Sequence, residues 1–269
     1  MDSGVIVERP IGIFDSGVGG ISIAKAIRSE LPSENLIYVA DQAFSPYGSQ
    51  SKEIIEERAE TVSRFLSNQD CKAIVVACNT ATLHSIDILR SKFQIPVIGV
   101  EPGIKPAVMQ SEAGVIGVLA TEQTLKSPSF QLLKERFSEQ ATIVVQACPR
   151  FVELVEEGDL NSPETFKVVA RYVMPLLDKG ADQIVLGCTH YPFLKPVIEY
   201  VLQDRAGIID TATPVAVQVK NKLSELNLLN PHDDSGSFKA WSSNTSENIS
   251  SSVSLLLGDE VTVLAIPHL

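Results

Sequence analysis

The sequence predicts an α/β fold made of two pseudosymmetric α/β domains with mostly parallel sheets. Short apolar, β-branched runs alternate with helical patterns along the chain. These runs are apolar at nearly every position, which is typical of parallel strands buried on both faces. The chain also repeats one feature, because the runs before Cys78 and Cys188 each end at a thiol, 110 residues apart.

Eight apolar runs are predicted as strands: residues 10–15, 35–41, 72–77, 95–100, 114–120, 141–147, 182–187 and 206–210. Helices are predicted at residues 20–31 and 51–67, which lie between the first three predicted strands. Their apolar side chains follow the 3.6-residue period of a helix. Residues 230–252 are rich in Ser, Asn and Asp and are predicted as loop or weakly ordered structure. Residues 260–266 can add a last strand.

The spacing predicts an internal repeat. Cys78 and Cys188 are 110 residues apart in sequence, and so are Ile98 and Ile208, which both lie in predicted strands. Cys78 and Cys188 would then follow equivalent strands at their carboxyl ends, where open α/β sheets bind ligands. If the two units face each other, both thiols border one cleft. The alternative is an accidental similarity between two α/β units.

Composition limits the function. The chain has 269 residues, of which 44% are hydrophobic and 20% charged, and a net charge of −11. Such an acidic chain is a poor candidate for nucleic acid or anionic membranes. No apolar run approaches the roughly 18–20 residues of a membrane helix, and residues 1–14 lack the basic start of a secretory signal. A cytoplasmic protein is expected.

The four cysteines form no CxxC pair, so neither a zinc ribbon nor a thioredoxin motif is predicted, and no metal site is expected. Cys78 precedes a predicted helix start at Asn79-Thr80, where the helix dipole is expected to lower the pKa of the thiol. A thiolate there could act as a base or a nucleophile. The alternative is a buried thiol that packs as a small apolar group. Cys71 and Cys148 lack a matching context and are expected to be structural.

His190 follows Cys188 by two residues and could hold or tune its thiolate. The alternative is a histidine that only caps or packs. A Cys-His pair also suggests a cysteine hydrolase, but a hydrolase gives no reason for a second thiol.

Residues 15–20 read DSGVGG and follow the first predicted strand. A dinucleotide fingerprint G-x-G-x-x-G would need glycine at Ser22, so it is disfavoured. A tight turn whose backbone N–H groups bind a carboxylate fits better, with Asp15 as an acid–base partner. The alternative role for Asp15 is a helix cap.

Four motifs now resemble one family. DSGVGG (15–20), DQAFSPYGSQS (41–51), VVACNTAT (75–82) and LGCTHYP (186–192) together resemble the glutamate racemases, cofactor-independent amino-acid racemases with two cysteines. The motifs occur in the family's order over about residues 10–215, and the joint match is specific. The chain after about residue 230 is not covered. Phe44-Ser45 departs from the small, polar residues expected before PYG.

The resemblance implies an active site in the cleft between two domains, the first formed by 1–98 and 211–269 and the second, inserted, by 99–210. It implies that Cys78 and Cys188 are the two acid–base residues, with Asp15, His190 and Glu156 assisting. The adjacent Glu157 leaves the Glu156 assignment open. The implied substrate-binding residues are Asp15, Ser16, Pro46, Tyr47, Gly48, Asn79, Thr80, Thr121, Thr189 and His190.

The expected function is that of a glutamate racemase, which interconverts L- and D-glutamate by two-base proton transfer without a cofactor. Its D-glutamate would supply peptidoglycan synthesis, and hence cell wall biogenesis and cell shape. Glutamate is the expected partner, with no nucleic acid and no membrane, and a homodimer is considered. The alternatives are a racemase or isomerase of aspartate or a related dicarboxylate, and a non-catalytic amino-acid-binding protein.

Overall fold

The computed structural model describes residues 6–244 and 248–266. The strands are β1 (Ile11–Asp15), β2 (Leu36–Ala40), β3 (Ala73–Val76), β4 (Val97–Gly99), β5 (Val115–Ala120), β6 (Thr142–Ala147), β7 (Gln183–Gly187), β8 (Gly207–Ile209), β9 (Phe238–Ser242) and β10 (Val263–Ala265). The α-helices are α2 (Ile21–Glu30), α3 (Lys52–Asn68), α4 (Asn79–Lys92), α5 (Ile104–Gln110), α6 (Glu122–Lys126), α7 (Pro128–Arg136), α8 (Pro149–Glu156), α9 (Pro163–Asp178), α10 (Lys195–Leu202), α11 (Ala212–Glu225) and α12 (Ile249–Leu257). Short 3₁₀ helices are η1 (Gln42–Phe44), η2 (Tyr47–Ser49) and η3 (Tyr191–Leu194).

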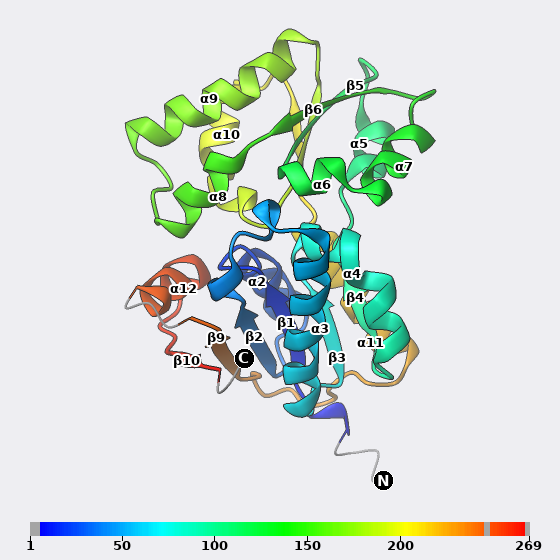
Figure 1. Ribbon diagram of the computed structural model, residues 1–269, viewed down its shortest axis with the longest axis vertical. Coiled ribbons are helices and arrows are strands. Elements are labelled where there is room, and N and C mark those ends of the chain that lie inside the picture. Colours follow the sequence, from blue (N-terminus) through cyan, green and yellow to red (C-terminus); the bar gives the residue numbers. More distant parts are fainter. Residues whose placement is uncertain (1–5, 245–247, 267–269) are drawn as a thin grey trace.

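The strands form two sheets, and the pairings between described strands are parallel. The six-stranded sheet has the order β10-β9-β2-β1-β3-β4, and the four-stranded sheet has the order β6-β5-β7-β8. We call the units built on them the first and the second domain. In Figure 1 the second domain, with α8, α9 and α10, lies above the first.

The topology confirms the predicted internal repeat. The order β2-β1-β3-β4 of the first domain recurs as β6-β5-β7-β8 in the second. Cys78 comes just after β3 and Cys188 just after β7, so each thiol follows the third strand of its repeat. All eight strands predicted between residues 10 and 210 are present, with ends that differ by one or two residues.

Two layers of helices cover the six-stranded sheet. On one face Ile11 and Ile13 of β1 belong to a core that includes apolar residues of α2, α11 and α12. On the other face Phe14 packs in a core with residues of α3 and α4. Each such side chain, fully buried, contributes about 1.5–3 kcal/mol. The burial of both faces explains why β1 is apolar at nearly every position.

The second domain is layered in the same way. Ile116 and Val118 of β5 pack with α5 and α7, whereas Leu119 joins the core that contains residues of α8, α9 and α10. The carboxyl ends of both sheets point toward the junction between the domains, which places the two cysteines there (Figure 1).

The chain passes between the domains twice, after β4 and after β8. The two passages pack together, because a Cβ built on Gly103 would lie 2.6 Å from Ile209 Cγ2. Because β9 and β10 come after the second passage, the six-stranded sheet takes strands from both ends of the chain. The domain limits at 98/99 and 210/211 stay a prediction, with Gly99 still part of β4.

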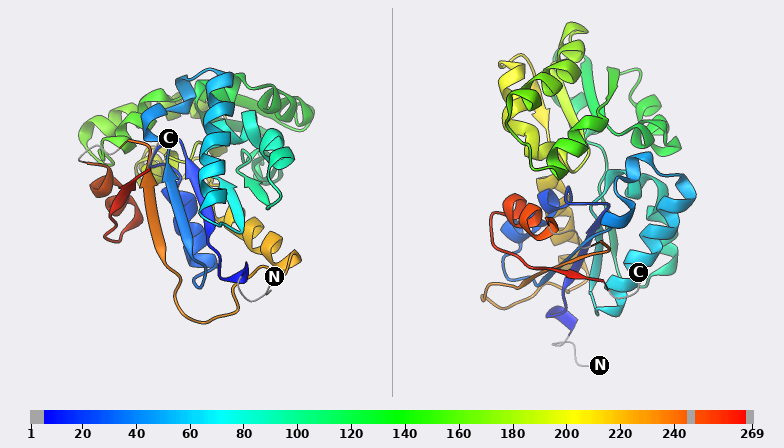
Figure 2. Two further views of the ribbon diagram at one scale, coloured as in Figure 1. Left: turned by 60° about the horizontal axis from the view of Figure 1, so that its bottom comes forward. Right: turned by 60° about the vertical axis from the view of Figure 1, so that its left-hand side comes forward.

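One prediction is wrong in part. Residues 230–252 are predicted as loop or weakly ordered structure, and residues 230–237 do form neither helix nor strand. However, β9 follows and pairs with β2, and α12 begins at Ile249. Figure 2 shows β9 and β10 along one edge of the six-stranded sheet, with α12 next to them. The strand depends on distant partners, since Trp241 packs edge-on against Phe65 with ring centroids 5.5 Å apart. Residues 245–247, also within the predicted loop, lie outside the described residues.

The last strand expected in residues 260–266 is confirmed as β10. Residues 1–5, on which part of the secretory-signal argument rests, lie outside the described residues. In the described part of the chain, no helix is long and apolar enough to cross a membrane.

Candidate active site

Both thiols line one small cavity between the domains. Cys78 comes from the first domain and Cys188 from the second. The other residues around the cavity are Ser16, Pro46, Gly48, Asn79, Thr80, Thr121, Val152, Thr189 and His190. Its volume is about 10 Å³, which is the room of roughly one water molecule. The cavity in this arrangement is therefore too small for an amino acid.

Cys78 is the N-cap of α4, and its Sγ accepts the Ala81 N–H at 3.4 Å. Burial raises the pKa of Cys78, and the nearby Asp15 carboxylate raises it further. The expected lowering of this pKa is therefore wrong. A helix terminus contributes about 0.3–1 kcal/mol, whereas burial can shift a pKa by about 3–5 units, at roughly 1.36 kcal/mol each. The surroundings of Cys78 therefore favour the thiol over the thiolate.

Cys188 has a basic neighbour instead. Its Sγ lies 3.7 Å from His190 Nδ1, and His190 Nε2 lies 2.8 Å from Glu156 Oε1. Burial alone would lower the pKa of His190, but hydrogen bonds to Cys188 and Glu156 outweigh it, so the pKa is raised. The arrangement favours an imidazolium beside the second thiol.

Asp15 links the domains and is not a helix cap. Its Oδ1 accepts the Gly17 N–H at 2.8 Å, and its Oδ2 accepts the Thr189 hydroxyl at 2.9 Å. Helix α2 begins after Gly20 without a side-chain cap. Burial raises the pKa of Asp15, although the His190 charge opposes this. The Asp15 carboxyl group therefore lies close enough to Cys78 to influence the pKa of its thiol.

Two glycines of residues 15–20, Gly17 and Gly19, make room for the second domain. A Cβ on Gly17 would lie 2.1 Å from Glu156 Oε1, and a Cβ on Gly19 would lie 2.2 Å from His190 Nδ1. The Val18 N–H donates to Glu156 Oε1 at 3.0 Å. The turn does bind a carboxylate through its backbone, as expected, but that carboxylate belongs to the protein. Gly17 and Gly19 thus face side chains of the opposite domain, whereas Gly20 faces its own domain.

Tyr47 is fully buried and does not line the cavity, unlike its neighbours Pro46 and Gly48. Its hydroxyl donates to Asp41 Oδ2 at 2.6 Å, and Arg58 donates to both Asp41 oxygens at 2.9 Å. The Arg58 guanidinium also lies 4.1 Å from the centroid of the Phe44 ring. This buried network fixes the PYG loop against α3.

Hydroxyl groups from both domains meet at the other side of the cavity. Thr80 Oγ1 lies 3.0 Å from Thr121 Oγ1 and 3.2 Å from Thr124 Oγ1. Thr121 is also the N-cap of α6. Beside them, the buried Asn79 side chain has no hydrogen-bond partner for either amide atom within the described residues. An unpaired buried amide costs about 1–3 kcal/mol, so Asn79 is ready to bind a polar ligand.

The structure brings most predicted site residues together. Asp15 and Glu156 stand behind the lining and reach it through Thr189 and His190. Tyr47 bonds to Asp41, which also lies outside the lining. Sequence reasoning missed Val152 in the lining, and missed Thr124, Asp41 and Gln42 behind it. The T-x-x-T spacing of Thr121 and Thr124 at a helix start was the one available signal.

Cys71 and Cys148 lie outside the cavity. Both are buried, and Cys71 belongs to the core between the six-stranded sheet, α3 and α4. Burial raises the pKa of Cys71 to about 12. Cys148 Sγ donates to the Gln146 carbonyl at 3.4 Å.

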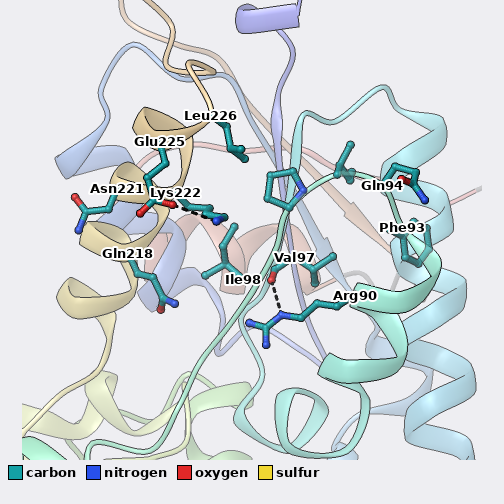
Figure 3. Close-up of a pocket in the computed structure, with 12 residues that line it drawn as sticks. Arg90, Phe93, Gln94, Val97, Ile98, Gln218, Asn221, Lys222, Glu225 and Leu226 are labelled. Atoms are coloured by element: carbon teal, nitrogen blue, oxygen red, sulfur yellow. Dashed lines mark hydrogen bonds and ion pairs between the residues drawn. The ribbon is translucent and has the colours of Figure 1, made fainter.

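A much larger groove, of about 710 Å³, lies between the end of α4, β4 and α11. Figure 3 shows Arg90 reaching the Val97 carbonyl and Lys222 paired with Glu225. None of the residues predicted to act on a substrate lines this groove. The largest groove among the described residues is therefore not the candidate active site. The predicted site residues lie instead around the small cavity between the thiols.

Comparisons with known proteins agree with this geometry. The profile of the family Asp/Glu/Hydantoin racemase matches residues 21–219. Glutamate racemase of Methylococcus capsulatus is 50% identical over 249 residues, which cover 93% of this chain and 92% of the relative. The crystal structure of Francisella tularensis glutamate racemase in complex with D-glutamate is similar, with a TM-score of 0.85, 32% identity, and 97% and 98% of the two chains covered. For Escherichia coli glutamate racemase in complex with L-glutamate and the activator UDP-MurNAc-ala, the TM-score is 0.84 at 31% identity, over 96% and 98%.

Proposed function

The chain belongs to the Asp/Glu/Hydantoin racemase family and is an amino-acid racemase, an isomerase, and we propose that it interconverts L- and D-glutamate with Cys78 and Cys188 as its two bases. The observation that carries this proposal is the placement of the two thiols. They come from equivalent strands of two repeats and line one cavity.

Racemisation removes the α-proton from one face of the amino acid and returns a proton to the other. With one thiolate and one thiol on opposite faces, no group has to cross the substrate. The thiolate takes the α-proton while the opposite thiol gives its own proton to the α-carbon. The enzyme ends with its proton on the other cysteine, so each direction of the reaction starts from a different protonation state.

The surroundings suggest which state is at rest. Cys78 is buried beside Asp15, whose negative charge opposes a thiolate. Cys188 stands beside His190, whose raised pKa favours the imidazolium. We assign the resting thiol to Cys78. The family resemblance pairs Cys188 with the L-substrate and Cys78 with the D-substrate.

The α-carbanion must be stabilised by the site. The unpaired Asn79 amide and the hydroxyls of Ser16, Thr80, Thr121 and Thr189 are the groups we assign to the polar ends of glutamate. Closure of the cavity around the substrate would exclude water and strengthen each of these interactions.

The test uses protein freed of metal and of pyridoxal phosphate. L-Glutamate in D₂O should lose its circular dichroism and gain deuterium at Cα, and the same should hold for D-glutamate. The equilibrium constant should be about one, because L- and D-glutamate are mirror images. Aspartate at equal concentration is the control for the rival substrate. Activity that appears only after pyridoxal phosphate is restored would contradict the proposal, and so would exchange with aspartate alone.

A glycine substitution tests the closed site. In Gly19→Ala the added methyl would lie 2.2 Å from His190 Nδ1, which belongs to the other domain. We expect kcat/KM for racemisation to fall at least about 100-fold, since closure places His190 and misplacement costs that much. The melting temperature should change little, because alanine for glycine also restricts the unfolded chain. Unchanged kcat/KM would mean that the domains close without this contact.

Further parts of the proposal rest on the family resemblance alone. We propose that the D-glutamate supplies peptidoglycan synthesis, and so cell wall and cell shape, in the cytoplasm. Rescue of a depleted strain by external D-glutamate would support this. A homodimer is also proposed, and light scattering during gel filtration decides it.

A further inference from the structure

The Glu156 carboxylate joins the two domains. It stands at the end of α8 in the second domain and reaches His190 Nε2 at 2.8 Å. From the first domain it accepts the Val18 N–H at 3.0 Å on Oε1 and the Gln42 side-chain amide at 2.9 Å on Oε2. One carboxylate thus connects the histidine beside Cys188 with two donors that belong to the opposite domain.

The two donors are available only when the domains are together. The Glu156 side chain is 18% exposed in this arrangement, and Gly17 makes the approach feasible because a Cβ there would lie 2.1 Å from Oε1. Burial raises the pKa of Glu156, but the hydrogen bonds from His190, Val18 and Gln42 lower it overall. When the domains separate, Glu156 loses both first-domain donors and keeps only His190.

Among the described residues, the Gln42 side chain makes no hydrogen bond other than the one to Glu156. Its amide nitrogen donates to Glu156, and its buried Oε1 has no partner within residues 6–244 and 248–266. A buried unpaired carbonyl is unfavourable. The cost is offset by a charge-assisted hydrogen bond across the domains, which is stronger than one between neutral groups.

We propose that Gln42 is a positioning residue, which together with the Val18 N–H holds Glu156 in place and so makes the alignment of His190 beside Cys188 depend on domain closure. The inference rests on the proposed two-cysteine function and names a new participant in it. Gln42 touches neither thiol, so it acts through Glu156 and His190.

The test compares Gln42→Met with Gln50→Met. Both remove the same side-chain amide from the same loop region, but Gln50 donates to the Phe44 carbonyl within the first domain, at 3.2 Å. Amide hydrogen exchange measured by NMR, without substrate, reads the contact directly. Val18 N–H bonds across the domains, whereas the adjacent Gly17 N–H bonds to Asp15 in the same domain.

In Gln42→Met we expect the Val18 amide to exchange about tenfold faster, with Gly17 unchanged within about twofold, because only the closed contact is weakened. In Gln50→Met both amides should keep their wild-type rates. The value of kcat/KM for glutamate racemisation should fall about 10- to 100-fold in Gln42→Met, as expected for the loss of a hydrogen bond to a charged group. KM should change less than kcat, because Gln42 is outside the cavity lining.

An unchanged Val18 exchange rate in Gln42→Met would overturn the proposal. Equal acceleration of both amides, or equal losses in the two variants, would also overturn it, because the effect would then be a general loosening of the loop. The exchange experiment needs no activity. If the wild-type protein fails to racemise glutamate, the proposed function fails, while the Val18 and Gly17 rates still decide whether Gln42 holds Glu156.

Discussion

Replacing either Cys78 or Cys188 by serine is expected to abolish racemisation, with a loss of at least about 10³-fold in kcat/KM. A serine hydroxyl is too weak a base at neutral pH to replace a thiolate. The two variants should differ with a glutamate analogue that carries a leaving group at Cβ. Elimination needs only one deprotonation, so Cys78→Ser should act on the L-analogue and Cys188→Ser on the D-analogue. Keto acid released after hydrolysis of the elimination product measures both.

Cys148→Ser is the matched control. This thiol is fully buried outside the cavity, and a serine hydroxyl could keep its hydrogen bond to the Gln146 carbonyl. Its racemisation should stay within about threefold of wild type. Equal rates of elimination from both enantiomers in both active-site variants would contradict the two-base mechanism.

Arg58→Met is expected to destabilise the protein by about 3–5 kcal/mol, because it leaves the Asp41 carboxylate buried without its partner. Asp41 is 0% exposed and receives two hydrogen bonds from Arg58 and one from Tyr47. The melting temperature should fall by roughly 10 °C. The PYG loop should also lose its fixed position, so KM for glutamate should rise.

Arg64→Met, on the same helix, is the control. Arg64 pairs with Glu60 one turn away, and its side chain is 64% exposed, so its loss should cost no more than about 0.5 kcal/mol. The double variant Arg58→Met/Asp41→Asn should be less destabilised than Arg58→Met, since it removes the unpaired charge. Equal melting temperatures for Arg58→Met and Arg64→Met, measured by calorimetry, would refute the argument.

The sequence predicted what is local. Apolar strands that end at Cys78 and Cys188, and the polar residues that follow them, are short-range patterns, so the two repeats and most of the cavity lining could be expected. The strand β9 could not, because its stability comes from pairing with β2 and from packing against Phe65. Its own Ser- and Asn-rich surroundings predict a loop.

The contacts behind the cavity are also non-local. Glu156 meets Val18 and Gln42 across 138 and 114 positions of sequence, and no periodic pattern marks such a pair. For Cys78 the helix start was placed correctly, but the direction of its pKa was wrong. A helix terminus can be read from the sequence, whereas the degree of burial, which dominates this pKa, depends on the opposite domain.

The paired passages of the chain between the domains are in contact at Gly103 and Ile209, and we expect them to act as a two-stranded hinge. Such a hinge permits rotation about one axis and resists sliding. When it swings open, Cys78 keeps Ser16 beside it and Cys188 keeps His190, since each pair lies within one domain. The bonds that must break join the two domains, such as those of Asp15 to Thr189, of Glu156 to the first domain, and of Thr80 to Thr121. The molecule therefore carries two half-sites that stay assembled in solvent, and each turnover only has to bring them together.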